Sequence, residues 1–398
     1  MKKPWVVLAC GCAILCIAVG VRNGFGLFLQ PMSLEYGWGR QVFSLAMAIQ
    51  NLAWGLFGPF VGAVADRYGA GRVVAGCALV YAVSLVFMAF ADTPLALNAS
   101  SGLFVGFALS GVGFGTILAV VGRAFPPEKR SSALGLAAAA GSFGQFVLLP
   151  VIQLLIQHFD WHVALWCVAG ITALIVPLAA AMSGRPAAGA AGTMSLGGAL
   201  REAWRERSFH LLFWGYFVCG FHVTMLMVHL PAFVTDAGLK PEHGMTALAL
   251  IGLFNVIGTL GAGWLGGRVS KKYILSGIYA VRGLLIGMLV LLPLTPLTLY
   301  LFAAGIGLLW LGTVPLTNGL VGQIFGVRYM ATLTGIVFLG HQVGAFIGVW
   351  LAGYLYDTTG SYQGVLMIAI GLGVFAALIN LPVNEQPIAE RRPASAIA

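Results

Sequence analysis

Two arginines lie inside apolar stretches of the chain, where a charged side chain is costly. Arg22 stands in VGVRNGFGLF and Arg282 in IYAVRGLL. An arginine within a membrane span costs on the order of 2.5–3.5 kcal/mol on insertion scales, so such a charge usually faces a wet cavity and has a partner. All 12 acidic residues fall at the ends of these stretches, in loops or in tails. The simplest partner is therefore an external anion, a carboxylate held by the guanidinium fork.

A structural interpretation of these arginines also remains open. At 1.5 Å per residue, Arg22 lies roughly 25 Å along its helix from Trp5 and about 12 Å short of Gln30. Its side chain can extend outward and donate to backbone carbonyls instead of binding an anion. The same two interpretations apply to Arg282.

Uncharged polar residues at similar depth can complete a binding site. Asn23 follows Arg22 directly, and Asn318 lies near Pro315, whose ring frees a backbone carbonyl that can face a cavity. Each asparagine can equally serve as a hydrogen bond between helices. We predict Arg22, Asn23, Asn318 and Arg282 as substrate-binding residues.

Three histidines are the other ionisable side chains at depth that titrate near neutral pH, namely His222, His229 and His341. His341, in FLGHQVG, lies roughly 16 Å into its helix and near the membrane midplane. The hypothesis is that Arg22 binds a carboxylate while His341 or His222 takes up a coupled proton. The alternative is a neutral histidine that is buried and bonded to a neighbour.

The composition identifies the elements that must hold these residues. The chain has 398 residues, of which 60% are hydrophobic and 8% charged, whereas soluble domains average about 25% charged residues. Its long apolar runs are continuous rather than alternating, which predicts an all-α membrane protein. The twelve predicted spans lie near 5–30, 41–65, 72–91, 96–123, 131–157, 161–183, 209–235, 244–267, 273–293, 297–324, 330–356 and 364–382.

The basic residues predict the orientation in the lipid bilayer. With a cytoplasmic N-terminus, 17 of the 21 Lys and Arg residues lie on the cytoplasmic side. This bias predicts a multi-pass protein of the cytoplasmic (inner) membrane with both termini in the cytoplasm. The net charge of +9 is then a topology signal and requires no nucleic-acid partner. The six cysteines lack metal-ligand spacing, so neither a metal nor a cofactor is expected.

One longer gap, residues 184–208, separates the first six predicted spans from the last six. We predict an N-terminal bundle at 1–183, a cytoplasmic linker at 184–208, a C-terminal bundle at 209–384 and a cytoplasmic tail at 385–398. Apolar residues from 196 to 204 recur at helical spacing, which predicts an amphipathic helix on the inner membrane surface. An ordinary solvated loop is the alternative.

The two halves resemble each other. GAVADR, residues 62–67, recurs as GWLGGR, residues 263–268, at an offset of 201. Phe125 and Gly135 match Phe325 and Gly335 at an offset of 200. A shared offset at the same rank of span indicates an internal duplication of six spans, as in transporters built from parallel repeats.

GAVADRYGAGR, residues 62–72, resembles the signature of the major facilitator superfamily between spans two and three. The resemblance implies two pseudo-symmetric six-helix bundles, spans 1, 4, 7 and 10 lining a central cavity, alternating access and a monomer. The predicted gating residues are Gly62, Asp66, Arg67, Gly69 and Arg72. Asp66 can dock on a helix N-terminus or on basic loop residues, while Gly62 permits close helix approach and Gly69 a tight turn.

Span one resembles the monocarboxylate and oxalate/formate transporters of that superfamily, in RNGFGLFLQPM followed by EYGWGRQVFSLAMAI. The resemblance implies a secondary active transporter for a small organic anion, a monocarboxylate moved by proton symport, with Arg22 as its span-one cation. The sequence departs from that group in span eight, where Asn255 and Thr259 stand in the region that usually holds an arginine.

Two other functions remain as alternatives. An exporter of drugs or metabolites can use the same fold, although span five lacks the Gly-Pro pair typical of antiporters. A substrate sensor or scaffold is also compatible with the sequence. An enzyme is not expected, because there is no H-E-x-x-H and no G-x-S-x-G beside an acid.

Overall fold

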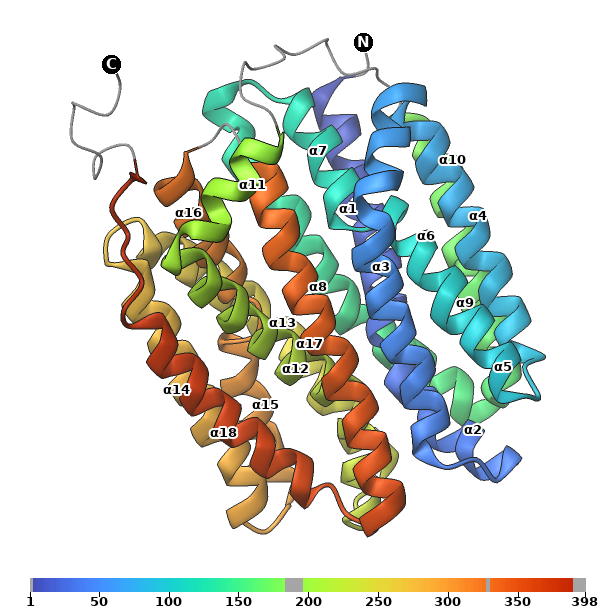
Figure 1. The fold of residues 1–398 in the computed structure, drawn as a ribbon. Helices are drawn as coiled ribbons and strands as arrows, with labels where there is room; N and C mark the ends of the chain where they lie inside the picture. The colour runs from blue at the N-terminus through green and yellow to red at the C-terminus, as the bar shows by residue number, and fades with distance from the viewer. Residues whose placement is uncertain (1–2, 183–195, 327–329, 389–398) are drawn as a thin grey trace, which may run out of the picture.

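The computed structural model describes residues 3–182, 196–326 and 330–388, apart from the side chains of Asp66 and of residues 127–128, 130–132, 196–200 and 330–332. Within these ranges the secondary structure is helical, and twelve helical segments are long and apolar enough to cross a membrane. The predicted fold class is confirmed, and the predicted spans agree with the observed ones within a few residues. The chain forms two six-span bundles, one from each half of the sequence (Figure 1).

The first bundle contains the blue to teal helices of Figure 1. Its elements are α1 (Pro4–Asn23), η1 (Phe25–Phe28), α2 (Leu29–Tyr36), α3 (Arg40–Tyr68), α4 (Ala70–Ala89), α5 (Pro94–Leu97), the π-helix η2 (Asn98–Phe104), α6 (Val105–Val112), α7 (Phe114–Ala124), α8 (Pro127–His158), α9 (Trp161–Ala173), α10 (Ile175–Ala179) and η3 (Ala180–Met182). The second bundle follows the short α11 (Leu196–Arg205). Its elements are α12 (Arg207–Asp236), α13 (Pro241–Gly266), α14 (Lys271–Leu291), α15 (Pro296–Leu308), α16 (Thr313–Phe325), α17 (Met330–Thr359) and α18 (Gln363–Asn380).

Spans four and ten are interrupted at equivalent places. In span four, α6 ends at Val112 and the extended residue Gly113 separates it from α7. In span ten, α15 ends at Leu308 and α16 begins at Thr313. The two breaks are related by about the offset of the sequence repeat. Interrupted spans in matching positions of two halves are typical of transporters and lie near their binding sites.

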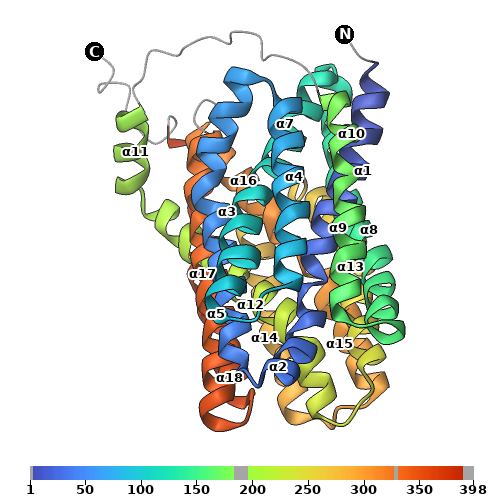
Figure 2. The same cartoon turned by 90° about the vertical axis from the view of Figure 1, so that its right-hand side faces the viewer.

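Three contacts between the bundles are the most extensive. Helix α17 packs against α3, α8 packs against α13, and η1 packs against α12. Figure 2 shows α17 beside α3 and α13 beside α8. Span one therefore reaches the second bundle through its short 3-10 segment, immediately after Arg22.

Small residues set the position of α1. A Cβ on Gly20 would lie 2.6 Å from the carbonyl oxygen of Gly144 on α8, and a Cβ on Gly144 would overlap the carbonyl of Cys16. Backbones that approach this closely tolerate only glycine at the contact. The two glycines thus fix the depth and rotation of the helix that carries Arg22.

The predicted gating motif lies where α3 turns into α4. Gly69 has a φ of +97°, so the predicted tight turn is confirmed. The close helix approach expected at Gly62 is not seen among the described residues, where an added Cβ would meet no atom within 4 Å. Arg67 and Arg72 are exposed. The side chain of Asp66 lies outside the described part of the structure.

The helix expected from the amphipathic pattern is present as α11. Ala203 is buried and Trp204 is 64% exposed, so the two neighbouring residues face different surroundings. Its position on a membrane surface stays a prediction. Residues 183–195 of the linker lie outside the described ranges.

The contact between α1 and α8 generates a stability prediction. Gly144→Ala inserts a methyl group into backbone of α1 and should cost about 1–3 kcal/mol, as overpacking does elsewhere. Gly135→Ala on the same helix is the matched control, since its added Cβ meets no atom within 4 Å. Thermal unfolding in detergent should give a lower melting temperature for Gly144→Ala only. Equal melting temperatures would contradict the packing described here.

Candidate functional site

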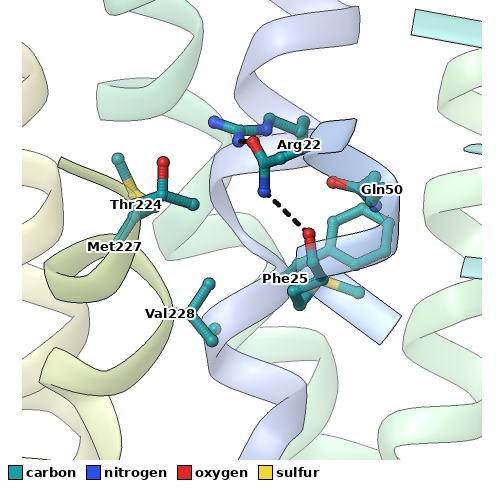
Figure 3. A pocket seen from close by; sticks show the side chains of 9 residues that line it. Arg22, Phe25, Gln50, Thr224, Met227 and Val228 are labelled. Atoms are coloured by element: carbon teal, nitrogen blue, oxygen red, sulfur yellow. Dashed lines mark hydrogen bonds between the residues drawn. The ribbon is translucent and has the colours of Figure 1, made fainter. Parts of the chain in front are cut away.

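A small pocket surrounds Arg22 at the contact between the bundles. Spans one, two and seven contribute its lining, which consists of Arg22, Phe25, Gly26, Met47, Gln50, Asn51, Thr224, Met227 and Val228. Figure 3 shows Arg22 and Gln50 on one side of it and Thr224, Met227 and Val228 of α12 on the other. Arg22 is the one charged residue of this lining, and the other side chains are apolar or neutral.

The local path of span one brings Arg22 and the second bundle together. Helix α1 ends at Asn23, and Gly24 donates its N–H to the carbonyls of Gly20 and Val21. The 3-10 turn η1 then starts, and a Cβ on Gly26 would lie 2.5 Å from the carbonyl oxygen of Met227. The glycine therefore allows α12 to close over the pocket directly beside Arg22.

The Arg22 guanidinium donates to two amide oxygens. Its Nη2 donates to Oδ1 of Asn51, and its Nη1 lies 3.4 Å from Oδ1 of Asn23. Asn51 donates its Nδ2 to the Met47 carbonyl at 2.7 Å, which orients Oδ1 towards the arginine. The head group thus faces the pocket instead of extending outward to backbone carbonyls. Neutral amides supply hydrogen bonds but leave the positive charge uncompensated.

One chain of hydrogen bonds leads from Arg22 to α13. Nδ2 of Asn23 donates to Oε1 of Gln145 at 2.9 Å. Nε2 of Gln145 donates across the bundle boundary to the carbonyl of Leu248 at 2.6 Å. The residue next to Arg22 is therefore tied to the second bundle through α8.

A second chain leads from Arg22 to α17. Nε2 of Gln342 donates to the backbone carbonyl of Asn51 at 2.9 Å. This bond leaves Oε1 of Gln342 as an acceptor 3.0 Å from Nδ1 of His341, so Nδ1 carries the ring proton. His341 is thereby connected to Arg22 through Asn51 and Gln342.

The structure does not bring Arg282 to this pocket, which corrects its predicted role as a substrate ligand. Its side chain is fully buried, with Nε 3.2 Å and Nη2 2.5 Å from the carbonyl oxygen of Leu309. Nη2 also donates to the carbonyl of Trp310, and Nη1 lies 3.4 Å from Sγ of Cys219. Both carbonyls belong to the break in span ten, where the helix provides no N–H partner. Arg282 takes the place of the missing backbone donors.

The remaining predicted residues lie apart from the pocket lining. Asn318 is half-buried on α16. Asn255 stands in span eight where an arginine was expected. Its Oδ1 accepts the backbone N–H of Leu311 at 3.0 Å, so it provides an acceptor for an N–H group in the span-ten break. His222 donates Nε2 to the Ala369 carbonyl on α18 at 2.8 Å.

An ionic cluster closes the end of the molecule opposite to the start of α1 and the end of α18, here termed the distal latch (Figure 1). Arg40 of α3 binds both carboxylate oxygens of Asp236 on α12, each at 2.6 Å, and donates to the Tyr362 hydroxyl at 2.8 Å. Asp357 of α17 accepts the backbone N–H groups of Arg40 and Gln41 at 2.8 Å. The latch consists of Arg40, Asp236, Asp357 and Tyr362 and joins the two bundles.

His229 lies behind this latch instead of at the pocket. Its Nε2 donates to the Val349 carbonyl at 3.1 Å, so Nδ1 is the acceptor for the Tyr362 hydroxyl at 2.9 Å. Burial raises the pKa of Tyr362, which keeps the hydroxyl protonated as a donor. Arg40 and Asp236 lie directly beside the ends of predicted spans. Their pairing could not be inferred from the sequence, because 196 residues separate them.

Two six-span bundles with interrupted spans and a charged pocket between them are typical of transporters. Residues 11–348 match the family model of the Major Facilitator Superfamily. The chain belongs to this superfamily and is a transporter rather than an enzyme.

Relatives with assigned names cover nearly the whole chain. An uncharacterized MFS-type transporter of Bacillus subtilis (strain 168), YcxA, is 26% identical, with 96% of this chain and 95% of that protein covered. Monocarboxylate transporter 11 of Homo sapiens is 27% identical, with 95% and 82% covered.

Solved structures of transporters share the fold. A bacterial homologue of the human lysosomal transporter Spinster, in an inward-facing and occupied conformation, has a TM-score of 0.80 at 13% identity, with 99% of each chain covered. A mutant of the nucleoside transporter NupG has a TM-score of 0.79 at 16% identity, with 96% of this chain and 100% of that chain covered.

The distal latch generates a prediction about access to the pocket. Asp236→Asn removes the counterion of Arg40. The distally closed state should lose about 1.4 kcal/mol of stabilisation or more, which increases the distally open population about tenfold. The measurement is the labelling rate of Met227→Cys, in a background whose native cysteines are replaced, by an impermeant maleimide added at the distal side. Asp92→Asn is the control, because it makes the same chemical change at an exposed residue in the loop between spans three and four, within the first bundle. Identical labelling of all variants would show that the ion pair does not hold this end closed.

Proposed function

We propose that the protein is a secondary active transporter that moves a small monocarboxylate by alternating access, with proton symport. The observation that carries this proposal is the Arg22 guanidinium, which lines the pocket with no carboxylate in the same lining. A guanidinium has five N–H groups, and in the described part of the chain two are directed at amide oxygens. The others can bind an anion. The names of the monocarboxylate transporter relatives support the same substrate class.

The pocket lining supports a short substrate. Phe25, Met47, Met227 and Val228 provide apolar surface beside the single cation. A monocarboxylate matches one positive charge and an apolar wall, whereas a dicarboxylate would bring a second charge that the lining does not neutralise. Asn23, which orients Oδ1 towards Arg22, supports the site without entering the lining.

We further propose the arrangement in the membrane. The bias of basic residues supports an inner-membrane protein with cytoplasmic termini, with bundles at 1–183 and 209–384 and with 184–208 and 385–398 in the cytoplasm. The distal latch then closes the outer side, and the motif at 62–72 acts at the inner gate. The protein works as a monomer.

For proton coupling, the contacts of the histidines favour His341. Its Nδ1 joins the hydrogen-bond chain through Gln342 and Asn51 to Arg22. A second proton on the His341 ring would add a positive charge to the hydrogen-bond chain that leads to Arg22 and would strengthen the attraction for an anion. His222 and His229 bond to backbone carbonyls away from the pocket.

The substrate proposal predicts selective binding of carboxylates. A panel of acetate, propionate, butyrate and benzoate should include compounds that raise the melting temperature of the purified protein, while propionamide should have no effect. Arg22→Gln should weaken that binding at least about tenfold, because a charge-assisted hydrogen bond is lost. Arg201→Gln, which removes an exposed arginine on α11, is the charge-matched control. Stabilisation by neutral or cationic compounds alone would move the assignment to an exporter.

The coupling proposal predicts a change in proton flux. In proteoliposomes, uptake of the best carboxylate should acidify the lumen with wild-type protein and should be uncoupled from protons in His341→Gln. His222→Gln serves as the comparison for a buried histidine outside the hydrogen-bond chain. Proton-coupled uptake that survives both substitutions would contradict coupling through these histidines.

A further inference from the structure

A second polar group in the pocket has no assigned role. Thr224 lies on α12, is 1% exposed and contributes to the same lining as Arg22. Its Oγ1 has no hydrogen-bond partner among the described residues. Figure 3 shows Thr224 on the helix opposite to the one that carries Arg22, with the pocket between them.

An orphan hydroxyl is unusual at this position. A threonine inside a helix normally donates to the carbonyl three or four residues earlier. Thr246 on α13 does so, with Oγ1 2.7 Å from the Glu242 carbonyl oxygen. Buried polar atoms without a partner destabilise the folded state and commonly mark a site that a ligand or water completes.

The other members of the lining define what can complete the site. Arg22 offers donors from the first bundle, and Thr224 offers a hydroxyl from the second. Between them lie the apolar side chains of Met47, Met227 and Val228, which can make no hydrogen bond of ordinary strength with Thr224. The amides of Gln50 and Asn51 also belong to the lining, but neither forms a hydrogen bond with Thr224. An oxygen of a bound ligand can accept the hydroxyl proton.

We propose that Thr224 is a substrate-binding residue that donates a hydrogen bond to the carboxylate held by Arg22, so that a small monocarboxylate bridges the two bundles. This inference rests on the proposed function and extends it to the second bundle. A carboxylate has two oxygens with about four acceptor positions, so it can accept from both residues at once. The anion therefore binds most tightly when α12 lies closed over η1.

The test compares Thr224→Val, which keeps the shape and removes the hydroxyl, with Thr224→Ser, which keeps the hydroxyl. The ligand is whichever of acetate, propionate, butyrate or benzoate raises the wild-type melting temperature most. Arg22→Gln is measured in parallel. Dissociation constants come from the dependence of the melting temperature on ligand concentration.

Thr224→Val should bind that carboxylate about tenfold more weakly, the loss expected for one hydrogen bond to a charged group. The ligand-free variant should melt at the same temperature as wild type or higher, because an unsatisfied buried hydroxyl has been removed. Thr224→Ser should restore the affinity to within a few-fold. If Thr224→Val does not fold, Thr224→Ala replaces it with the same expected loss.

Three different results would overturn the inference. If wild type binds a carboxylate and Arg22→Gln abolishes that binding while Thr224→Val binds as wild type does, Thr224 is not a ligand and the proposed function stands. If no carboxylate in the panel binds wild type, the proposed function fails, and the inference fails with it. A ligand-free melting temperature that falls in Thr224→Val would show that the hydroxyl has a structural partner.

Discussion

The structure depends on one positive charge, the half-buried guanidinium of Arg22, which has no carboxylate beside it in the described pocket lining. Arg22 costs on the order of 2.5–3.5 kcal/mol to place in a span, and the protein offsets this cost with amide oxygens from Asn51 and Asn23. Both asparagines belong to hydrogen-bond chains that end in the second bundle, at Leu248 and at Gln342. Arg22 is thus connected to two of the contacts between the bundles. Binding and relative motion of the bundles can be linked through these contacts.

The two arginines within the spans differ in their hydrogen-bond acceptors, and this difference indicates different roles. Arg282 lies against three acceptors, the carbonyls of Leu309 and Trp310 and the sulfur of Cys219, and these occupy all three of its nitrogens. It stabilises an interrupted helix. Arg22 shares a pocket with apolar side chains and an orphan hydroxyl, so its hydrogen bonding is incomplete. The same residue type at similar depth is structural in one case and a candidate ligand in the other.

Much of this architecture is readable from sequence because it depends on local patterns. Continuous apolar runs predicted the twelve spans, and the glycine in GAVADRYGAGR predicted the turn at Gly69. The failures involve tertiary contacts. Gly62 looked like a packing glycine, yet an added Cβ there would meet no described atom within 4 Å, and the Arg40–Asp236 pair joins distant parts of the chain. Thr224 could not be singled out at all, because its distinguishing property is the lack of a partner in the folded protein.

The most direct test of the central claim is the position of a bound carboxylate. A crystal structure with 3-bromopropionate, recorded at the bromine absorption edge, locates the halogen by anomalous scattering independently of the protein density. The account predicts bromine against Met47, Met227 or Val228 and carboxylate oxygens within hydrogen-bond distance of the Arg22 guanidinium. Bromine at another site, with Arg22 still bonded to Asn51 and Asn23 alone, would contradict the claim that this arginine is retained for an anionic substrate.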